Sequence, residues 1–371
     1  MRNLSHWALV TAVALVSGAA APPAAEACTG ITLKAEDGST VFARTMELGG
    51  GLLEWGLVVV PRGTAYAGTT PSGKPGVKWT AKYAFTGVNP SGVPFVADGL
   101  NEAGLAVGTF MFANYAEYQK VTERDADKTL APFELVTWML TNFATAAEVK
   151  EGLARVKVAA APFDAPGWVG ASPFHWIVVD ESGAAVVVEY VRGELTVHDD
   201  PLGVITNAPT FDWHVTNLKG YVNLTPQDPP AAALGALSLT SFGHGSGMRG
   251  LPGDFTPPSR FVRAAFLKSA VVPGKTADET VLRAFHVLNQ FDIPLGAVRG
   301  SGPEGQPIYE QTDWTSAADL KNRRYYVHTI DTRRIHVIDL MRAPRDGAAP
   351  IYVPLPTEEV FEDLTPPAPA K

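Results

Sequence analysis

The sequence has 371 residues and only one cysteine, Cys28. A disulfide bond within the chain is therefore impossible, although such bonds are common in exported proteins. The sequence also lacks a long run of lysine and arginine, and its formal net charge is −8. Because it has no basic track that could neutralise phosphates, we expect no nucleic-acid partner.

The sequence likewise has little that indicates a membrane span or a bound metal. Its N-terminal apolar run, Trp7 to Val16, is much shorter than the roughly 20 residues that a membrane helix needs, and no later run is long enough. The histidines do not fall into a metal-ligand spacing. The glycines from Gly243 to Gly253 lack the Gly-Lys-Ser/Thr of a phosphate-binding loop. We therefore predict no stable membrane span, no metal and no other cofactor.

The first 27 residues follow the pattern of a signal peptide. Arg2 supplies a positive charge, the apolar run from Trp7 to Val16 follows, and Ala25-Glu26-Ala27 is an A-x-A cleavage site. We predict that residues 1–27 are removed and that the mature protein is periplasmic or secreted. The mature chain then begins at its only cysteine.

Three interpretations of Cys28 are open. In the first, it carries a lipid anchor in a non-catalytic envelope binding protein, although that signal favours a Leu-like residue where Ala25 stands and a small residue where Glu26 stands. In the second, it is a bystander. In the third, it is a nucleophile whose own α-amine, freed by cleavage, acts as general base. A thiol pKa of about 8.5 and an α-amine pKa of about 8 suit that chemistry near neutral pH.

A β-hairpin is predicted directly after Cys28. Ile31–Lys34 and Thr40–Arg44 have strand-like composition, and Asp37-Gly38 lies in the turn between them. Such a hairpin returns Arg44 to the start of the first strand. A cation there favours the thiolate form of a nearby cysteine.

The rest of the chain alternates groups of strands with pairs of helices, an order typical of a layered α+β domain. Helices are expected from Pro132 through Leu140, from the Thr145/Glu148 capping pattern through Val156, over Ser259–Val271, and over Thr276–Phe291, which is capped by Thr276 and Glu279. Further strands are expected over Leu57–Pro61, Leu105–Phe110, Phe174–Val179, Ala184–Val191, Glu194–His198, Gly203–Thr206, Tyr325–Ile330 and Arg334–Leu340.

Two segments are predicted to lie outside regular structure. Asp98–Gly104 is rich in turn residues and is expected to be a turn before the next strand. Residues 346–371 are expected to form a C-terminal tail that is frayed around Pro366–Pro369. A single catalytic domain over residues 28–345 is predicted between the signal peptide and this tail.

Several segments of this sequence resemble the choloylglycine hydrolase family, which contains conjugated bile salt hydrolases and penicillin V acylases. The resemblance is carried by Cys28-Thr29-Gly30, Phe42–Glu47, Val204–Trp213 and Gly250–Phe261, and it runs from Cys28 to about Leu340. It implies the four-layer αββα fold of N-terminal-nucleophile hydrolases. It also implies hydrolysis of linear amide C–N bonds in small N-acyl compounds, often by a homotetramer.

The resemblance also implies roles for individual residues. Cys28 aligns with the nucleophile, and Arg44 aligns with an arginine beside the thiol. Asn207 aligns with an asparagine whose side-chain amide helps to form the oxyanion hole. Arg260 aligns with an arginine that supports the catalytic group.

Two positions depart from the family pattern. The family normally has Asp where this chain has Glu47, and that carboxylate helps to orient the nucleophilic residue. Met111 stands where bile salt hydrolases have Asn and penicillin V acylases often have Tyr; its backbone N–H can still complete the oxyanion hole. Met46 and Met111 are assigned to substrate binding. Export favours external amides, so penicillin V or N-acyl-homoserine lactones are expected ahead of bile salts. A methionine at position 111 favours an apolar acyl chain.

Overall fold

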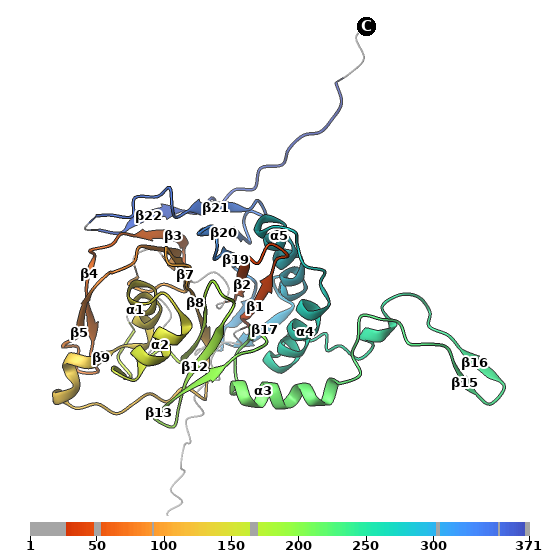
Figure 1. Cartoon of the computed structure of the whole chain (residues 1–371), viewed down its shortest axis with the longest axis horizontal. Helices are drawn as coiled ribbons and strands as arrows, with labels where there is room; N and C mark the ends of the chain where they lie inside the picture. Colours follow the sequence, from red (N-terminus) through yellow and green to blue (C-terminus); the bar gives the residue numbers. More distant parts are fainter. Residues whose placement is uncertain are drawn as a thin grey trace, which may run out of the picture.

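The computed structural model describes residues 27–47, 53–90, 93–163, 170–301, 305–347 and 349–367. Apart from Ala27, the predicted signal peptide lies outside the described residues, as do the last four residues of the chain. Two β-sheets form the centre of the described chain, and helices lie on their outer faces (Figure 1).

The first sheet has six antiparallel strands. Their order is β14 (Val204–Ile205), β1 (Thr29–Lys34), β2 (Thr40–Met46), β19 (Trp314–Asp319), β20 (Arg324–Thr329) and β21 (His336–Asp339). The β1–β2 hairpin forms as predicted: Asp37 Oδ1 accepts the Ser39 N–H at 2.9 Å, and Gly38 adopts φ = +84°. The register places Gly30 opposite Arg44, so the hairpin returns this arginine to the start of β1.

The second sheet has eight antiparallel strands. Their order is β13 (Glu194–Asp199), β12 (Ala185–Val191), β11 (Phe174–Val179), β8 (Ala106–Met111), β7 (Asp98–Asn101), β6 (Phe85–Pro90), β3 (Trp55–Val60) and β22 (Ile351–Pro354).

Two sequence predictions are wrong in this sheet. Asp98–Asn101, expected to be part of a turn, forms β7, because the Asp98 carboxylate accepts hydrogen bonds inside the sandwich from the hydroxyls of Ser316 (2.6 Å) and Tyr325. Ile351–Pro354, expected in the C-terminal tail, forms β22 and pairs with β3 as the last strand of the sheet. The folded domain therefore extends beyond residue 345.

Helices flank the two sheets. α1 (Leu135–Asn142) packs on β7 and β8 and is followed by α2 (Ala146–Leu153), whereas α4 (Pro257–Ala270) and α5 (Ala277–Leu288) pack on β1, β2 and β19. Both predicted capping patterns are confirmed: Thr145 Oγ1 accepts the Glu148 N–H at 3.1 Å, and Thr276 Oγ1 accepts the Glu279 N–H at 3.3 Å. The arrangement is the predicted four-layer αββα fold.

The inner faces of the sheets meet at glycines. A Cβ atom on Gly30 would lie 2.8 Å from Phe110 Cζ, and one on Gly108 would lie 3.2 Å from the rings of Phe110 and Phe42. Glycine at these positions therefore lets β1 and β8 approach each other closely. This close approach brings the residues at the ends of β1, β2 and β8 together.

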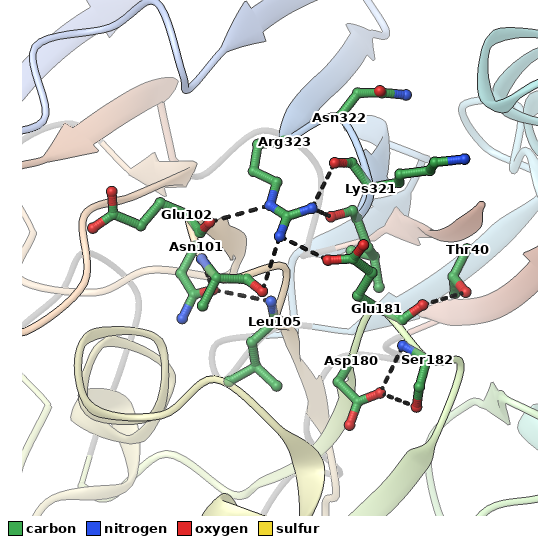
Figure 2. Close-up of polar contacts among 12 residues, drawn as sticks. Thr40, Asn101, Glu102, Leu105, Asp180, Glu181, Ser182, Lys321, Asn322 and Arg323 are labelled. Atoms are coloured by element: carbon green, nitrogen blue, oxygen red, sulfur yellow. Dashed lines mark hydrogen bonds and ion pairs between the residues drawn. The ribbon is translucent and has the colours of Figure 1, made fainter. Parts of the chain in front are cut away.

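Arg323 holds the end of the sandwich opposite Cys28 (Figure 2). It lies in the turn between β19 and β20 and donates from Nε to Glu102 O (3.1 Å) and from Nη2 to Ala103 O (3.2 Å), in the turn between β7 and β8. The same Nη2 lies 2.7 Å from Glu181 Oε2, in the turn between β11 and β12. One guanidinium group thus joins the six-stranded sheet to two turns of the eight-stranded sheet.

Residues 222–256, called the arm below, extend away from the sandwich (Figure 1). The arm follows α3 (Phe211–Asn217) and η3 (Leu218–Tyr221) and contains a hairpin of β15 (Ala232–Leu234) and β16 (Leu237–Leu239). Several of its apolar side chains are exposed, with Leu234 at 70% and Phe242 fully accessible.

The remaining elements are short. They are β4 (Ala65–Thr69) paired with β5 (Pro75–Thr80), η1 (Glu123–Lys128), β9 (Thr129–Leu130) paired with β10 (Lys157–Val158), η2 (Pro132–Glu134), η4 (Ser246–Met248), η5 (Asn289–Phe291), and β17 (Val298–Ser301) paired with β18 (Pro307–Glu310). In the part of the chain that the structure describes, every helix is too short or too polar to cross a bilayer.

Candidate active site

Cys28 lies directly before β1 and is almost completely buried. Its backbone N–H donates to Asn207 Oδ1 at 2.9 Å. Its sulfur lies 3.8 Å from Met46 Sδ and 4.0 Å from the backbone oxygen of Glu47. The β1–β2 register explains these contacts, because it pairs the start of β1 with the end of β2.

The surroundings of the Cys28 thiol act on its ionisation in both directions. Burial raises the pKa of the thiol to about 11; the positive charges of Arg44 and Arg260 lower it, and the negative charge of Glu47 raises it. A buried thiol of this kind needs a base or a compensating cation before it can act as a nucleophile. The two arginines supply the cations.

Arg44 is completely buried between the two sheets. Its guanidinium donates across the sandwich from Nη1 to Thr109 O at 2.5 Å and to Ala97 O at 3.4 Å, and from Nη2 to Met46 Sδ at 3.6 Å. The Phe110 ring lies 4.3 Å below the guanidinium carbon. These contacts fix the cation beside the sulfur pair of Cys28 and Met46.

Glu47 follows β2 and is also fully buried. Oε1 accepts the Thr312 hydroxyl at 2.7 Å, and Oε2 accepts the Thr45 hydroxyl at 3.1 Å. Burial raises the pKa of Glu47 to about 8, while Arg260 and the two hydroxyls act in the opposite direction. The Glu47 side chain, which is longer than the family's usual Asp, thus reaches two hydroxyl groups. Glu47 contacts the Cys28 sulfur through its backbone oxygen.

Asn207 follows β14 and joins the two sheets through its side-chain amide. Oδ1 accepts hydrogen bonds from the Cys28 N–H and from Arg260 Nη2, the latter at 2.6 Å, and Nδ2 donates to Met111 O at 2.9 Å. Because two donors face Oδ1, the orientation of the amide is fixed. The expected oxyanion donor therefore already uses one of its two N–H groups to hold the end of β8.

Arg260, on α4, completes the set from the side of the six-stranded sheet. Nη1 donates to the backbone oxygen of Cys28 and to Thr29 Oγ1, the latter at 3.0 Å, while Nε donates to Phe255 O at 2.9 Å. Burial lowers the pKa of Arg260 to about 10, against the favourable charges of Glu47 and Cys28. The guanidinium therefore holds the Cys28 carbonyl and the Asn207 oxygen with one rigid group.

The structure thus brings Cys28, Arg44, Glu47, Asn207 and Arg260 into one buried network. Met46 and Met111, predicted to bind substrate, lie at its border. Residues 48–52, 91–92 and 164–169 lie outside the description. The substrate-binding roles of the two methionines stay predictions.

Sequence reasoning missed several members of the network. Thr45 donates to Glu47 and accepts the Thr29 N–H at 3.2 Å, but single threonines in strands carry no motif. His175 and Glu189 support the segment around Asn207. A signal for these two existed, because each is a polar residue inside an otherwise apolar strand that is buried along nearly its whole length.

In the ranges that the structure describes, no three His, Cys, Asp or Glu residues lie close enough together to hold a metal ion. A cavity of about 770 Å³ is lined by Leu33, Asp200, Lys268 and neighbouring residues near the far ends of the strands, and Cys28 is not part of its lining. Its lining comes from strand ends, turns and residues of α4 and α5 at the end of the sandwich opposite Cys28, so this cavity is separate from the buried network.

Comparisons with known proteins cover nearly the same residues. Residues 28–352 match the family described as linear amide C–N hydrolases, choloylglycine hydrolase family. The bile salt hydrolase/transferase of Clostridium perfringens (strain 13 / Type A) is 36% identical over 323 residues, or 86% of this chain and 94% of that protein. The penicillin V acylase of Pectobacterium atrosepticum is 28% identical over 300 residues, or 75% of this chain and 72% of that protein.

Solved structures give the same result. A variant of conjugated bile acid hydrolase from Clostridium perfringens superposes with a TM-score of 0.78 at 30% identity, over 91% of this chain and 100% of that one. Penicillin V acylase from Agrobacterium tumefaciens shares the fold with a TM-score of 0.71 at 24% identity, over 89% and 92% of the two chains. With its fold, its buried cysteine network and these relatives, this chain belongs to the choloylglycine hydrolase family and is a hydrolase of linear amide C–N bonds.

Proposed function

We propose that this protein is an exported amidase in which Cys28 is both the N-terminal residue and the nucleophile. One observation carries the proposal: the only cysteine directly follows a signal-peptide cleavage pattern, and its backbone nitrogen and sulfur both lie in the buried network. A peptide nitrogen is not basic. Cleavage after Ala27 turns the same nitrogen into an amine that can take the thiol proton.

The reaction proceeds in two acyl-transfer steps. The Cys28 sulfur attacks the amide carbonyl carbon while the α-amine takes the thiol proton, and the carbonyl oxygen becomes an oxyanion. The C–N bond then breaks, and the departing amine receives that proton. Water attacks the resulting thioester with the α-amine as base, and the acid leaves as the thiol re-forms.

The backbone of β8 supports a place for the oxyanion. Thr109 N–H donates to Ala97 O, on the β7 side of β8. Alternate residues of an antiparallel strand direct their N–H and C=O groups to the same side. Met111, two residues after Thr109, therefore directs its N–H to the β7 side, the side on which its carbonyl accepts the Asn207 hydrogen bond. The Met111 N–H and the second N–H of the Asn207 amide are the proposed donors. Losing one such donor typically costs about 2.7–4 kcal/mol of transition-state stabilisation.

The proposed substrates are small N-acyl amides with an apolar or aromatic acyl group. The relatives named for bile salts and for penicillin V support these two classes of amide as candidate substrates. Met111 in β8 offers an apolar surface, and a periplasmic or secreted location favours external amides. Penicillin V and N-acyl-homoserine lactones therefore come before conjugated bile salts.

The proposal includes a homo-oligomer, a tetramer by family resemblance. The arm supports it, because Leu234 and Leu237 on its hairpin and Phe242 shortly after the hairpin expose apolar surface away from the sandwich. A second copy of the chain is the proposed cover for this surface. Sedimentation at micromolar concentration tests it: Leu237→Asp is expected to give monomers, whereas Leu282→Asp, at an exposed leucine of α5 outside the arm, is expected to leave assembly unchanged.

The nucleophile is tested with the exported product of the full-length gene. Intact-mass analysis is expected to show a chain that begins with an unmodified Cys28. A diacylglyceryl adduct would support the lipid-anchored binding protein instead. Turnover of penicillin V, N-octanoyl-homoserine lactone and glycocholate, read as released amine or free acid, is expected to fall at least about 10³-fold in Cys28→Ala. Unchanged turnover in that variant would reject the nucleophile.

A further inference from the structure

The segment that carries Asn207, residues 206–211, is held by three buried groups outside the catalytic set. Thr206 O accepts a hydrogen bond from His175 Nε2 at 2.9 Å, and Phe211 N–H donates to Glu189 Oε1 at 2.9 Å. Between them, Asn207 O accepts from His214 Nε2 at 2.9 Å. The backbone is thus fixed at the residue directly before Asn207, at Asn207 itself and at Phe211, four residues after it.

Glu189 is the common member of these contacts. Besides the Phe211 N–H, its carboxylate meets His175 Nδ1 and His198 Nε2, each at 3.3 Å. Burial raises the pKa of Glu189, but the hydrogen bonds from His175 and His198 outweigh that effect and lower it to about 2. Glu189 is therefore a buried carboxylate whose two oxygens are both satisfied, in a strand that is otherwise apolar.

The His175 ring is fixed from the side of β8. It stacks on Phe112 with ring centroids 4.3 Å apart and meets the edge of Phe110 at 6.3 Å. These two phenylalanines flank Met111, whose carbonyl receives the Asn207 side chain. One imidazole thus lies between the segment of β8 that carries the Met111 N–H, one of the two proposed oxyanion donors, and the backbone that precedes Asn207.

We infer that Glu189, through His175 and the Phe211 amide, is a positioning residue that sets the location of Asn207 for amide hydrolysis. Glu189 touches neither Cys28 nor Met111, so its effect on the reaction passes through the 206–211 segment. The inference extends the proposed function, because it assigns a support to the proposed oxyanion donor. Displacements on the order of 1 Å in such a donor can change rates about 10²-fold.

Asp180 provides a matched control in the same sheet. It is a buried carboxylate at the opposite end of β11 and accepts the Ala146 N–H and the Ser182 N–H, each at 3.0 Å. Like Glu189 it caps backbone amides, but it lies far along the strand from Asn207. A purely structural role for buried carboxylates predicts equal effects for Glu189→Gln and Asp180→Asn.

The kinetic test uses the mature protein with penicillin V as probe. Glu189→Gln is expected to lower kcat about tenfold or more while KM changes less than about twofold, and Asp180→Asn is expected to leave both within about twofold. In an Asn207→Ala background, Glu189→Gln is expected to have no further effect, because a support has nothing left to position. Full additivity of the two losses would overturn the inference.

A second measurement separates this inference from the proposed function. Hydrogen–deuterium exchange of residues 206–214 is expected to speed up in Glu189→Gln and to stay unchanged in Asp180→Asn. If wild-type protein hydrolyses none of the three amides, the proposed function fails, but the exchange result still decides whether Glu189 holds the segment. Unchanged exchange in Glu189→Gln would overturn the inference.

Discussion

Both ends of the sandwich are crossed by an arginine from the six-stranded sheet. At the end opposite Cys28, called the closed end below, Arg323 donates to the carbonyls of Glu102 and Ala103 and forms an ion pair with Glu181. At the active-site end, Arg44 donates to carbonyls of the eight-stranded sheet and to the Met46 sulfur. The two guanidinium groups do the same structural task in different electrostatic surroundings.

The difference lies in what else each positive charge meets. The Arg323 charge is shared with a carboxylate at 2.7 Å that is itself half exposed. Arg44 is completely buried, and its charge lowers the pKa values of the Cys28 thiol and the Asp98 carboxyl, both of which burial raises. A buried cation whose hydrogen-bond partners are neutral carbonyl groups is not neutralised by a carboxylate, so its charge acts strongly on nearby ionisable groups. This teaches that similar hydrogen bonding can serve either the fold or the chemistry.

The largest expected effect is that of Arg44→Leu. Removal of this cation leaves Arg260 alone to lower the pKa of the Cys28 thiol against burial and Glu47, so amide hydrolysis should fall at least about 10²-fold. The alkylation rate of Cys28 by iodoacetamide at pH 7 should fall with it. Arg44→Lys keeps a charge and is expected to recover part of both rates. If Arg323→Leu slowed alkylation equally, the contrast between the two arginines would be lost.

Arg323→Ala should affect stability and leave turnover unchanged. It removes the hydrogen bonds that join the two sheets at the closed end, at an expected cost of about 2 kcal/mol in the free energy of unfolding. Urea denaturation measures that cost, and the hydrolysis rate at low urea provides the control. A loss of turnover in the folded variant would show that changes at the Arg323 end of the sandwich affect the buried network around Cys28.

Glu47→Gln tests the carboxylate at the active-site end through the pH dependence of stability. The folded-state pKa of Glu47, about 8, lies above its ordinary value of 4.5, so the folded protein binds more protons than the unfolded chain between these values. Wild-type stability from this group therefore falls as pH rises through that window, by at most about 1.4 kcal/mol per pH unit. Glutamine does not titrate, so the variant should lose less. Parallel curves from urea unfolding at pH 5 to 8 would contradict the raised pKa.

Glu181→Gln is expected to have the smallest effect. It removes the carboxylate of the partly exposed pair with Arg323 and leaves the backbone carbonyl contacts in place. Such pairs contribute about 0–1 kcal/mol, so the melting temperature should shift little and less so at high salt. A loss as large as that of Arg323→Ala would mean that the ion pair, rather than the carbonyl contacts, holds the closed end.

The sequence was most informative where the physical signals are local. The Asp37-Gly38 turn and the caps at Thr145 and Thr276 depend on neighbouring residues, and all three formed as predicted. Asp98–Asn101 looked like a turn because Asp, Gly and Asn favour turns, but hydroxyls from Ser316 and Tyr325, more than 200 residues away, make a buried aspartate acceptable there. Partners so distant in the chain produce no recognisable pattern in the sequence around β7.

The candidate site shows the same division. Its five catalytic candidates were named from motifs, and the structure places them in one network. The use of the Asn207 amide to hold Met111 depends on the spacing of two sheets, which no motif records. Glu189 was overlooked because the apolar pattern of its strand predicts only that position 189 is buried. A buried carboxylate is costly unless it has hydrogen-bond partners, so its presence there was a signal.

The last strand of the eight-stranded sheet has a practical consequence for anyone who shortens this protein. The family match ends at residue 352, in the middle of β22 (Ile351–Pro354), and Leu355 directly after it is buried. A chain that ends at residue 352 would lose half of the pairing between β22 and β3. The unpaired backbone groups of β3 could then bind a strand of another chain, which favours aggregation. A safe stop codon belongs after residue 355.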